Sequence, residues 1–131
     1  MECQYRYFNV ELENHVAEVI INRPDKANSL HVKAWEEMKQ VFDDLAVNPK
    51  ARVIILRGAG KHFCAGIDLE VLMGLGALVE EPCEGRKREK LRKKVMELQA
   101  PINALENCSK PVLAAIHGAC LGAGLDLVAA A

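Results

Sequence analysis

Two glycine-containing segments each place backbone N–H groups where a predicted strand leads into a predicted helix. The first reads AGIDL (residues 65–69) and the second reads CLGAGLD (residues 120–126). N–H groups at the start of a helix attract negative charge. One donor from each turn, directed at the same carbonyl oxygen, would form an oxyanion hole. We therefore predict a site that stabilises negative charge developing on a carbonyl oxygen.

Other uses of such turns fit the residues poorly. A phosphate-binding loop ending at Gly60-Lys61 would need Ser or Thr at His62 and glycine at Ile55. A dinucleotide fingerprint beginning at Gly122 would need a glycine at Leu127, and no G-x-S-x-G segment is present. Nucleotide hydrolysis, hydride transfer and serine hydrolase chemistry are therefore disfavoured.

Asp126 is the ionisable residue closest in sequence to the second turn. It follows Ala123 by three positions, so its carboxylate lies on the first turn of the predicted helix and can project toward the oxyanion donors. The alternative is an acid favoured at that position only by the helix dipole.

Three ordered segments resemble the crotonase (enoyl-CoA hydratase/isomerase) superfamily. They are NRPDKANSL (22–30), HFCAGIDL (62–69), and KPVLAAIHG (110–118) continued by CLGAGLD (120–126). The resemblance implies an α/β crotonase-like core of repeated ββα units, with residues 1–131 as the N-terminal part of one acyl-CoA-binding domain. It also implies that the C-terminal helices are absent, and Ala131, inside an apolar helical pattern, leads us to expect a truncated chain.

By this resemblance, the N–H groups of Ala65 and Ala123 hold the thioester oxygen of the substrate. The family more often has glycine at the second position, so the Ala123 methyl implies a slightly narrower pocket. Asp68 could contact the ligand or cap the following helix. The implied substrate-binding positions are Ala65, Gly66, Ile67, Asp68, Leu69, Ala123 and, toward the CoA phosphates, Lys26. No metal and no separate cofactor are expected, because coenzyme A is part of the substrate.

Aspartate at position 126 also bears on the reaction. Hydratases that resemble this chain usually have Glu there, whereas Asp126 together with AGIDL and the long stretch between the turns resembles the Δ3,5-Δ2,4-dienoyl-CoA isomerases. In those enzymes the proton-carrying Glu and Asp lie further along the chain. We predict isomerisation of 3,5-dienoyl-CoA to 2,4-dienoyl-CoA in β-oxidation, with no turnover by residues 1–131 alone. The alternatives are 2-enoyl-CoA hydration with Asp126 as an acid/base, or a non-catalytic CoA- or RNA-binding relative.

The positioning elements follow from periodicity and turn residues. We predict strands at 5–12, 16–22, 53–56 and 112–116, the last two buried on both faces. Helices are expected from a Ser29 cap to about 48, briefly at 67–73, at 86–106 with a kink or break at Pro101, and from 125. Residues 74–85 are predicted to be a mobile loop, Trp35 to be core, and His117 to orient its turn.

Composition limits the partners. The net charge is −1 and half the residues are hydrophobic, so neither nucleic acid nor a membrane is expected. Five cysteines without a C-x-x-C pair indicate free thiols and not disulfides or zinc. No targeting segment is evident. We expect a homotrimer or homohexamer at full length, cytoplasmic if bacterial and mitochondrial or peroxisomal if eukaryotic.

Overall fold

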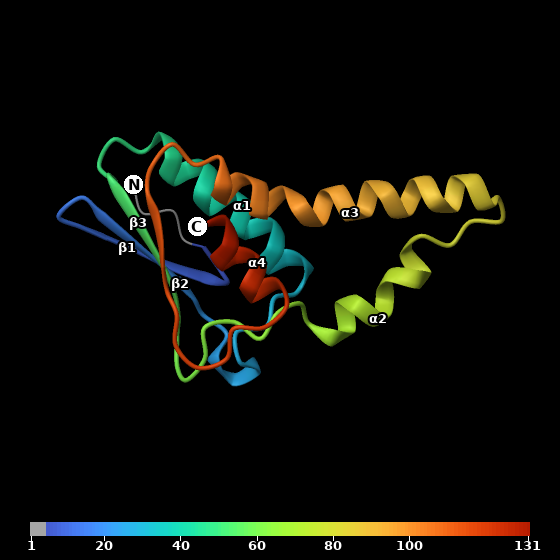
Figure 1. Cartoon of the computed structure of the whole chain (residues 1–131), viewed down its shortest axis with the longest axis horizontal. Helices are drawn as coiled ribbons and strands as arrows, with labels where there is room; N and C mark the ends of the chain where they lie inside the picture. Colours follow the sequence, from blue (N-terminus) through green and yellow to red (C-terminus); the bar gives the residue numbers. More distant parts are fainter. Residues whose placement is uncertain (1–4) are drawn as a thin grey trace.

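The computed structural model describes residues 5–131 and contains one four-stranded sheet in the order β1-β2-β3-β4 (Figure 1). The strands are β1 (Phe8–Glu13), β2 (Val16–Ile21), β3 (Val53–Gly58) and β4 (Val112–Ala115). β1 and β2 form an antiparallel hairpin, and β2, β3 and β4 run parallel. Asn14 and His15 close the hairpin with φ of 51° and 68°, as a tight two-residue turn requires. All four predicted strands are present.

Within residues 5–131, five helical elements connect or follow the strands. They are the 3₁₀ turn η1 (Pro24–Lys26), α1 (Val32–Val47), α2 (Leu69–Leu78), α3 (Glu84–Glu106) and α4 (Ala123–Ala130). The predicted Ser29 cap is wrong, because His31 caps α1 by accepting the Ala34 N–H at Nδ1 (3.3 Å). Burial, and next the Arg23 charge, lower the pKa of His31, which keeps Nδ1 available as an acceptor.

The segment between the two turns is more helical than predicted. Residues 74–78, expected in a mobile loop, belong to α2, and α3 continues through Pro101 without a break. Proline at 101 removes the hydrogen bond to the Glu97 carbonyl. Pro101 and Leu105 are the buried residues of α3, so tertiary packing of this half holds the helix despite the lost hydrogen bond.

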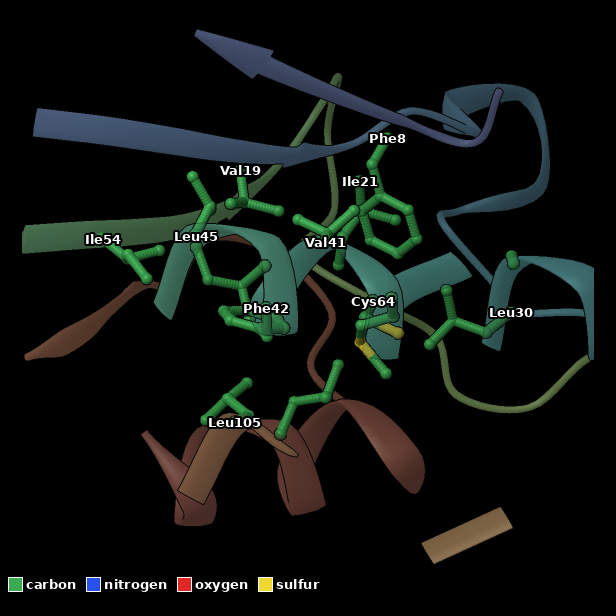
Figure 2. Close-up of a cluster of buried hydrophobic side chains, with 14 of the residues drawn as sticks. Phe8, Val19, Ile21, Leu30, Val41, Phe42, Leu45, Ile54, Cys64 and Leu105 are labelled. Carbon is green, nitrogen blue, oxygen red and sulfur yellow. The ribbon is translucent and has the colours of Figure 1, made fainter. Parts of the chain in front are cut away.

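The core lies between the sheet and helices α1, α3 and α4 (Figure 2). Trp35 is buried, as predicted, and its Nε1 donates to the Leu98 carbonyl of α3. The large side chains with essentially no exposure include Phe8, Val19, Ile21, Met38, Val41, Phe42, Ile54, Leu56, Leu105 and Leu127. They pack the sheet against α1, α3 and α4, and α4 begins at the second turn.

The sheet is buried on one face, which corrects the prediction that β3 and β4 are buried on both. Ile54, Leu56 and Gly58 are buried while the alternate β3 residues are half-buried, and Leu113 of β4 is 57% exposed. The reason is visible in Figure 1: within residues 5–131, the helices lie on a single side of the sheet.

Each parallel strand is followed by a second, very short extended segment before its helix. Leu30 pairs with Ile67, and Cys64 pairs with Cys120, through isolated parallel bridges. The order strand, short segment, helix therefore recurs for β2–α1, β3–α2 and β4–α4. This is the ββα repetition that we predicted.

Helix α2 and the N-terminal half of α3 extend away from the rest of the molecule (Figure 1). Leu91, Val95 and Leu105 lie on one face of α3. Leu91 and Val95 are 45% and 44% exposed, whereas Leu105 near the other end is buried. Only the C-terminal half of that face packs. Although α3 has 23 residues, no helix within residues 5–131 is long and apolar enough to cross a bilayer.

Candidate functional site

The structure brings the two glycine-containing turns side by side. The Leu121 N–H donates to the Cys64 carbonyl (3.0 Å), and the Cys64 N–H donates to the Ala119 carbonyl (3.1 Å). The Phe63 N–H donates to the His117 carbonyl (2.8 Å). Segments more than fifty residues apart in sequence thus run parallel at the start of α2 and α4.

Glycine at position 66 allows the first turn to approach the start of α4 closely. Its φ is +104°, and a Cβ there would lie 2.9 Å from the Leu121 carbonyl oxygen and 3.5 Å from the Ala123 nitrogen. The first distance is shorter than a carbon and an oxygen tolerate, and the backbone conformation also favours glycine. The Gly66 backbone therefore lies directly against the start of α4.

The cysteine at the base of the first turn is a packing residue. Cys64 is fully buried, its Sγ accepts the Gly66 N–H at 3.4 Å, and burial raises the pKa of its thiol. A protonated, inaccessible thiol is a poor nucleophile. Cys83, Cys108 and Cys120 are also free, as predicted, and Cys3 lies outside the described residues.

The N–H groups of the turns differ in what they bind. The Ala65 N–H, which we predicted as an oxyanion donor, donates to the Ala27 carbonyl at 3.0 Å and so holds the N-terminal loop. No hydrogen bond within residues 5–131 has the N–H of Ile67 or of Ala123 as its donor. Ala123 is the first residue of α4, where backbone donors lack partners inside the helix. Ile67 follows Gly66, which abuts Ala123, so the unpaired donors of the two turns are neighbours.

Asp126 lies on the first turn of α4, as predicted. Its backbone N–H donates to the Gly122 carbonyl (3.2 Å), and its side chain is exposed. Among the described residues, the carboxylate has no hydrogen bond or ion pair within the chain. It is thus a solvent-facing acid one helical turn after the Ala123 donor.

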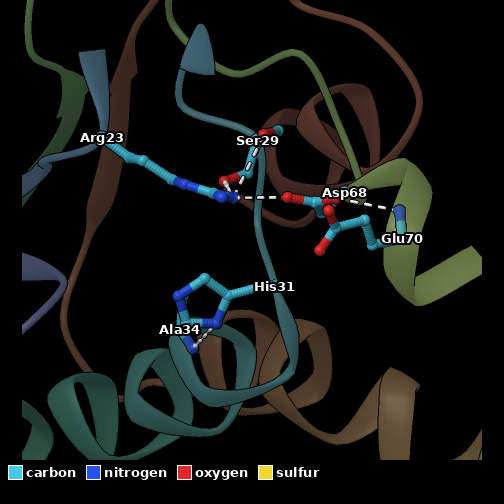
Figure 3. Close-up of polar contacts among 6 residues, drawn as sticks. All are labelled: Arg23, Ser29, His31, Ala34, Asp68 and Glu70. Carbon is cyan, nitrogen blue, oxygen red and sulfur yellow. Dashed lines mark hydrogen bonds and ion pairs between the residues drawn. The ribbon is translucent and has the colours of Figure 1, made fainter. Parts of the chain in front are cut away.

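Asp68 caps α2, which is one of the two roles that we considered for this residue. Oδ1 accepts the Glu70 N–H at 2.9 Å, and Oδ2 pairs with Arg23 at 2.7 Å (Figure 3). The Glu70 N–H, and next the Arg23 guanidinium, hold the pKa of Asp68 below its usual value. Because both carboxylate oxygens have partners within the chain, the Asp68 side chain has a structural role. Leu69, the next predicted contact residue, is 71% exposed.

Lys26 ends the 3₁₀ turn η1 and is exposed. Its neighbour Ala27 provides the carbonyl that binds the Ala65 N–H, so Lys26 lies next to the first turn. No ion pair or side-chain hydrogen bond of Lys26 occurs in the part of the chain that the structure describes. An exposed lysine beside the first turn is compatible with the predicted contact to the CoA phosphates, which stays a prediction.

Asn28 is a key residue that the sequence reading did not single out. It is the buried polar residue of the described chain, with 0% exposure and a φ of 57°. Its Oδ1 accepts the Arg23 N–H (2.9 Å), and its Nδ2 donates to the carbonyls of Ala59 (2.8 Å) and His62 (2.7 Å). Asn28 therefore ties the N-terminal loop to the segment that enters the first turn. Its place inside the NRPDKANSL segment was the available signal.

Substitution of Asn28 by Ala is expected to destabilise the fold by roughly 1–3 kcal/mol, because buried backbone groups lose their partners. Urea unfolding of the gene product that carries this chain measures the change. Asn9 is exposed on β1 and provides a control, since Asn9→Ala should leave the unfolding midpoint nearly unchanged. Equal midpoints for the two variants would contradict the role given to Asn28.

Two histidines form hydrogen bonds between the segments that lead into the two turns. His117 Nε2 lies 2.8 Å from the Gly60 carbonyl oxygen, and His62 Nδ1 accepts the Ala119 N–H at 3.0 Å. His117 therefore orients its turn, as predicted.

The basic residues of α3 between Arg86 and Lys94 form a mostly exposed helix face with acidic residues beside them. Salt bridges join Arg88 to Glu84, Arg92 to Glu89, Lys94 to Glu97, and both Arg86 and Lys90 to Glu81. Four acidic residues thus offset part of the positive charge that would attract an RNA backbone.

Known proteins support the motifs identified above. The sequence model described as enoyl-CoA hydratase/isomerase matches residues 11–131. The peroxisomal Delta(3,5)-Delta(2,4)-dienoyl-CoA isomerase of Arabidopsis thaliana is 46% identical over 119 residues, which are 90% of this chain and 43% of that protein. The human mitochondrial Delta(3,5)-Delta(2,4)-dienoyl-CoA isomerase is 38% identical over 121 residues, 90% of this chain and 36% of that protein. The chain thus spans less than half the length of these relatives.

The fold matches that of a solved enoyl-CoA hydratase. A crystal structure of an enoyl-CoA hydratase from Shewanella pealeana superposes with a TM-score of 0.85 at 26% identity, covering 98% of this chain and 45% of the other. The observed ββα repetition is therefore that of the crotonase-like core. Because the family match extends over nearly all of the described residues, this chain belongs to the enoyl-CoA hydratase/isomerase family.

Proposed function

We propose that the protein carrying this chain isomerises 3,5-dienoyl-CoA to 2,4-dienoyl-CoA, and that residues 1–131 supply its oxyanion hole. The observation that supports this most directly is the adjacency of two unpaired backbone donors, Ile67 and Ala123, with the Asp126 carboxylate one turn further along α4. The similarity to two dienoyl-CoA isomerases favours this reaction.

The proposed oxyanion hole consists of the Ala123 N–H and the Ile67 N–H. Ile67 thus takes the role that we predicted for Ala65. A donor already bound to the Ala27 carbonyl would have to give up that bond to serve the substrate. A preorganised donor has no such cost, and preorganisation is what makes backbone N–H groups effective at a developing oxyanion.

The chemistry follows from a polarised thioester. Hydrogen bonds to its oxygen make the C2 protons acidic and stabilise the extended enolate formed when one is removed. Return of a proton at C6 converts the 3,5-diene into the 2,4-diene, so atoms and charge balance. We propose that carboxylates outside residues 1–131 carry the proton. Asp126, as a nearby negative charge, would raise the pKa of a neighbouring carboxyl group and strengthen it as a base.

In this proposal, coenzyme A is part of the substrate and no resident metal or redox group takes part. Lys26 would contact the CoA phosphates. We further propose a homotrimer or homohexamer, in the cytoplasm of a bacterium or in mitochondria or peroxisomes of a eukaryote. The matched relatives named above are peroxisomal and mitochondrial.

The test is the product formed by the gene product that carries this chain. With 3,5-dienoyl-CoA, we expect growth of the ultraviolet absorbance of a diene conjugated to the thioester. Asp126→Asn should lower kcat by about tenfold or more, since a positioned charge that shifts a partner's pKa by one unit changes the ratio of its two forms tenfold. Asp43→Asn, at an exposed site on α1, is the matched control.

The runner-up activity is hydration of 2-enoyl-CoA, which the resemblance to an enoyl-CoA hydratase structure favours. Loss of the 2-enoyl absorbance without formation of a dienoyl product would replace the isomerase proposal by this one. Residues 1–131 alone should show neither reaction.

A further inference from the structure

We propose that Arg23 is a positioning residue for the oxyanion hole: it anchors Asp68 and Ser29, and so orients the N–H of the intervening Ile67. The inference rests on the proposed function, because it assigns Ile67 as a donor to the thioester. Arg23 lies in the N-terminal loop and would not touch the reacting atoms.

The guanidinium makes three contacts through one nitrogen (Figure 3). Nη1 donates to Asp68 Oδ2 at 2.7 Å, to the Ser29 carbonyl at 3.1 Å and to Ser29 Oγ at 3.3 Å. The Arg23 and Asp68 side chains are only 25% and 14% exposed. A short, charge-assisted and partly shielded contact holds geometry better than a surface ion pair does.

The partners of Arg23 lie on both sides of the bridge that holds Ile67. The Leu30 N–H donates to the Gly66 carbonyl (2.8 Å), and the Asp68 N–H donates to the Leu30 carbonyl (2.9 Å). Leu30 therefore holds the residue before Ile67 and the residue after it. Ser29 precedes Leu30, and Asp68 follows Ile67. The Arg23 side chain binds both Ser29 and Asp68, and so adds a second connection between these two segments.

Asp68 has little freedom apart from this contact. Its other carboxylate oxygen caps α2 through the Glu70 N–H (2.9 Å), and its carbonyl accepts the Val71 N–H (3.0 Å). Loss of the Arg23 charge would leave the cap but release the link to the loop. Backbone hydrogen bonds, those of Leu30 and that from the Ala65 N–H to the Ala27 carbonyl, would then set the direction of the Ile67 N–H without this side-chain anchor.

The experiment compares Arg23→Gln, Asp68→Asn and the double variant in the gene product that carries this chain. Asn at 68 can still cap α2, so it removes mainly the ion pair. We expect each single variant to lower kcat about 10- to 100-fold with little change in KM, as a slightly misplaced group does. The double variant should lose no more than a single one. The thioester C=O stretch of bound 2,4-dienoyl-CoA should move back toward its frequency in solution.

Arg57→Gln is the matched control. Arg57 pairs with Glu18 at 2.9 Å on the sheet, outside the turns, and its loss reports the effect of deleting an arginine–carboxylate pair in general. We expect this variant to keep the parental kcat and C=O frequency. Arg23→Lys, which retains the charge, should recover part of the activity and gives a second reading if Arg23→Gln does not fold.

The inference is overturned if an active parent keeps its kcat and C=O frequency in Arg23→Gln and Asp68→Asn. Losses that multiply in the double variant, or that Arg57→Gln reproduces, also overturn it. A parent enzyme without isomerase activity would instead overturn the proposed function.

Discussion

Replacement of Ala123 by proline is expected to lower the isomerase kcat by about 10²- to 10³-fold, the typical cost of losing one oxyanion donor. Ala123 is the first residue of α4, a position where proline has the backbone angle that the helix needs. The substitution therefore removes the N–H without removing an intrahelical hydrogen bond.

Ala123→Gly provides the comparison, because it retains the N–H and removes only the methyl group. We expect its kcat to stay within a few-fold of the parent, and both variants to have parental circular dichroism spectra. Steady-state kinetics with 3,5-dienoyl-CoA measure the difference. A proline variant with the kcat of the glycine variant would show that the Ala123 N–H does not bind the substrate oxygen.

Replacement of Gly118 by alanine is expected to destabilise the protein by roughly 2–6 kcal/mol, the combined cost of a strained backbone and of overpacking. Gly118 has a φ of +59°, and a Cβ there would lie 2.1 Å from the Lys61 carbonyl oxygen and 2.8 Å from His62 Nδ1. His62 Nδ1 accepts the Ala119 N–H, so the methyl group would separate the two turns where they are joined. Urea denaturation measures the change.

The control is the same substitution in α2. A Cβ at Gly76 meets nothing within 4 Å, and Gly76 lies inside a helix. Gly76→Ala should therefore stabilise that helix by up to about 1 kcal/mol. A Gly118→Ala variant as stable as the parent would show that the two turns do not approach as closely as described.

The positions of strands and helices were predictable from local patterns, and the errors occurred where a tertiary contact was decisive. The repeat of apolar residues from Val32 to Leu45 identified α1, but the cap is His31 and not Ser29, which instead binds Arg23. Pro101 was expected to kink or break α3, but no break occurs, because Pro101 is buried where α3 packs on the core. The half-exposed outer face of β3 and β4 reflects which elements lie above it, a property that strand periodicity does not contain.

The sequence by itself determined the family, the pairing of two glycine-containing turns and the place of Asp126 on the first turn of α4, because these depend on residue types at fixed local spacings. Only the tertiary structure decided which N–H of the first turn is unpaired. The Ala27 carbonyl, 38 residues earlier in the chain, reaches Ala65 and leaves Ile67 beside Ala123. The same holds for Asn28 and Arg23, since a buried amide or a shielded ion pair is defined by partners that are distant in sequence and that only folding brings together.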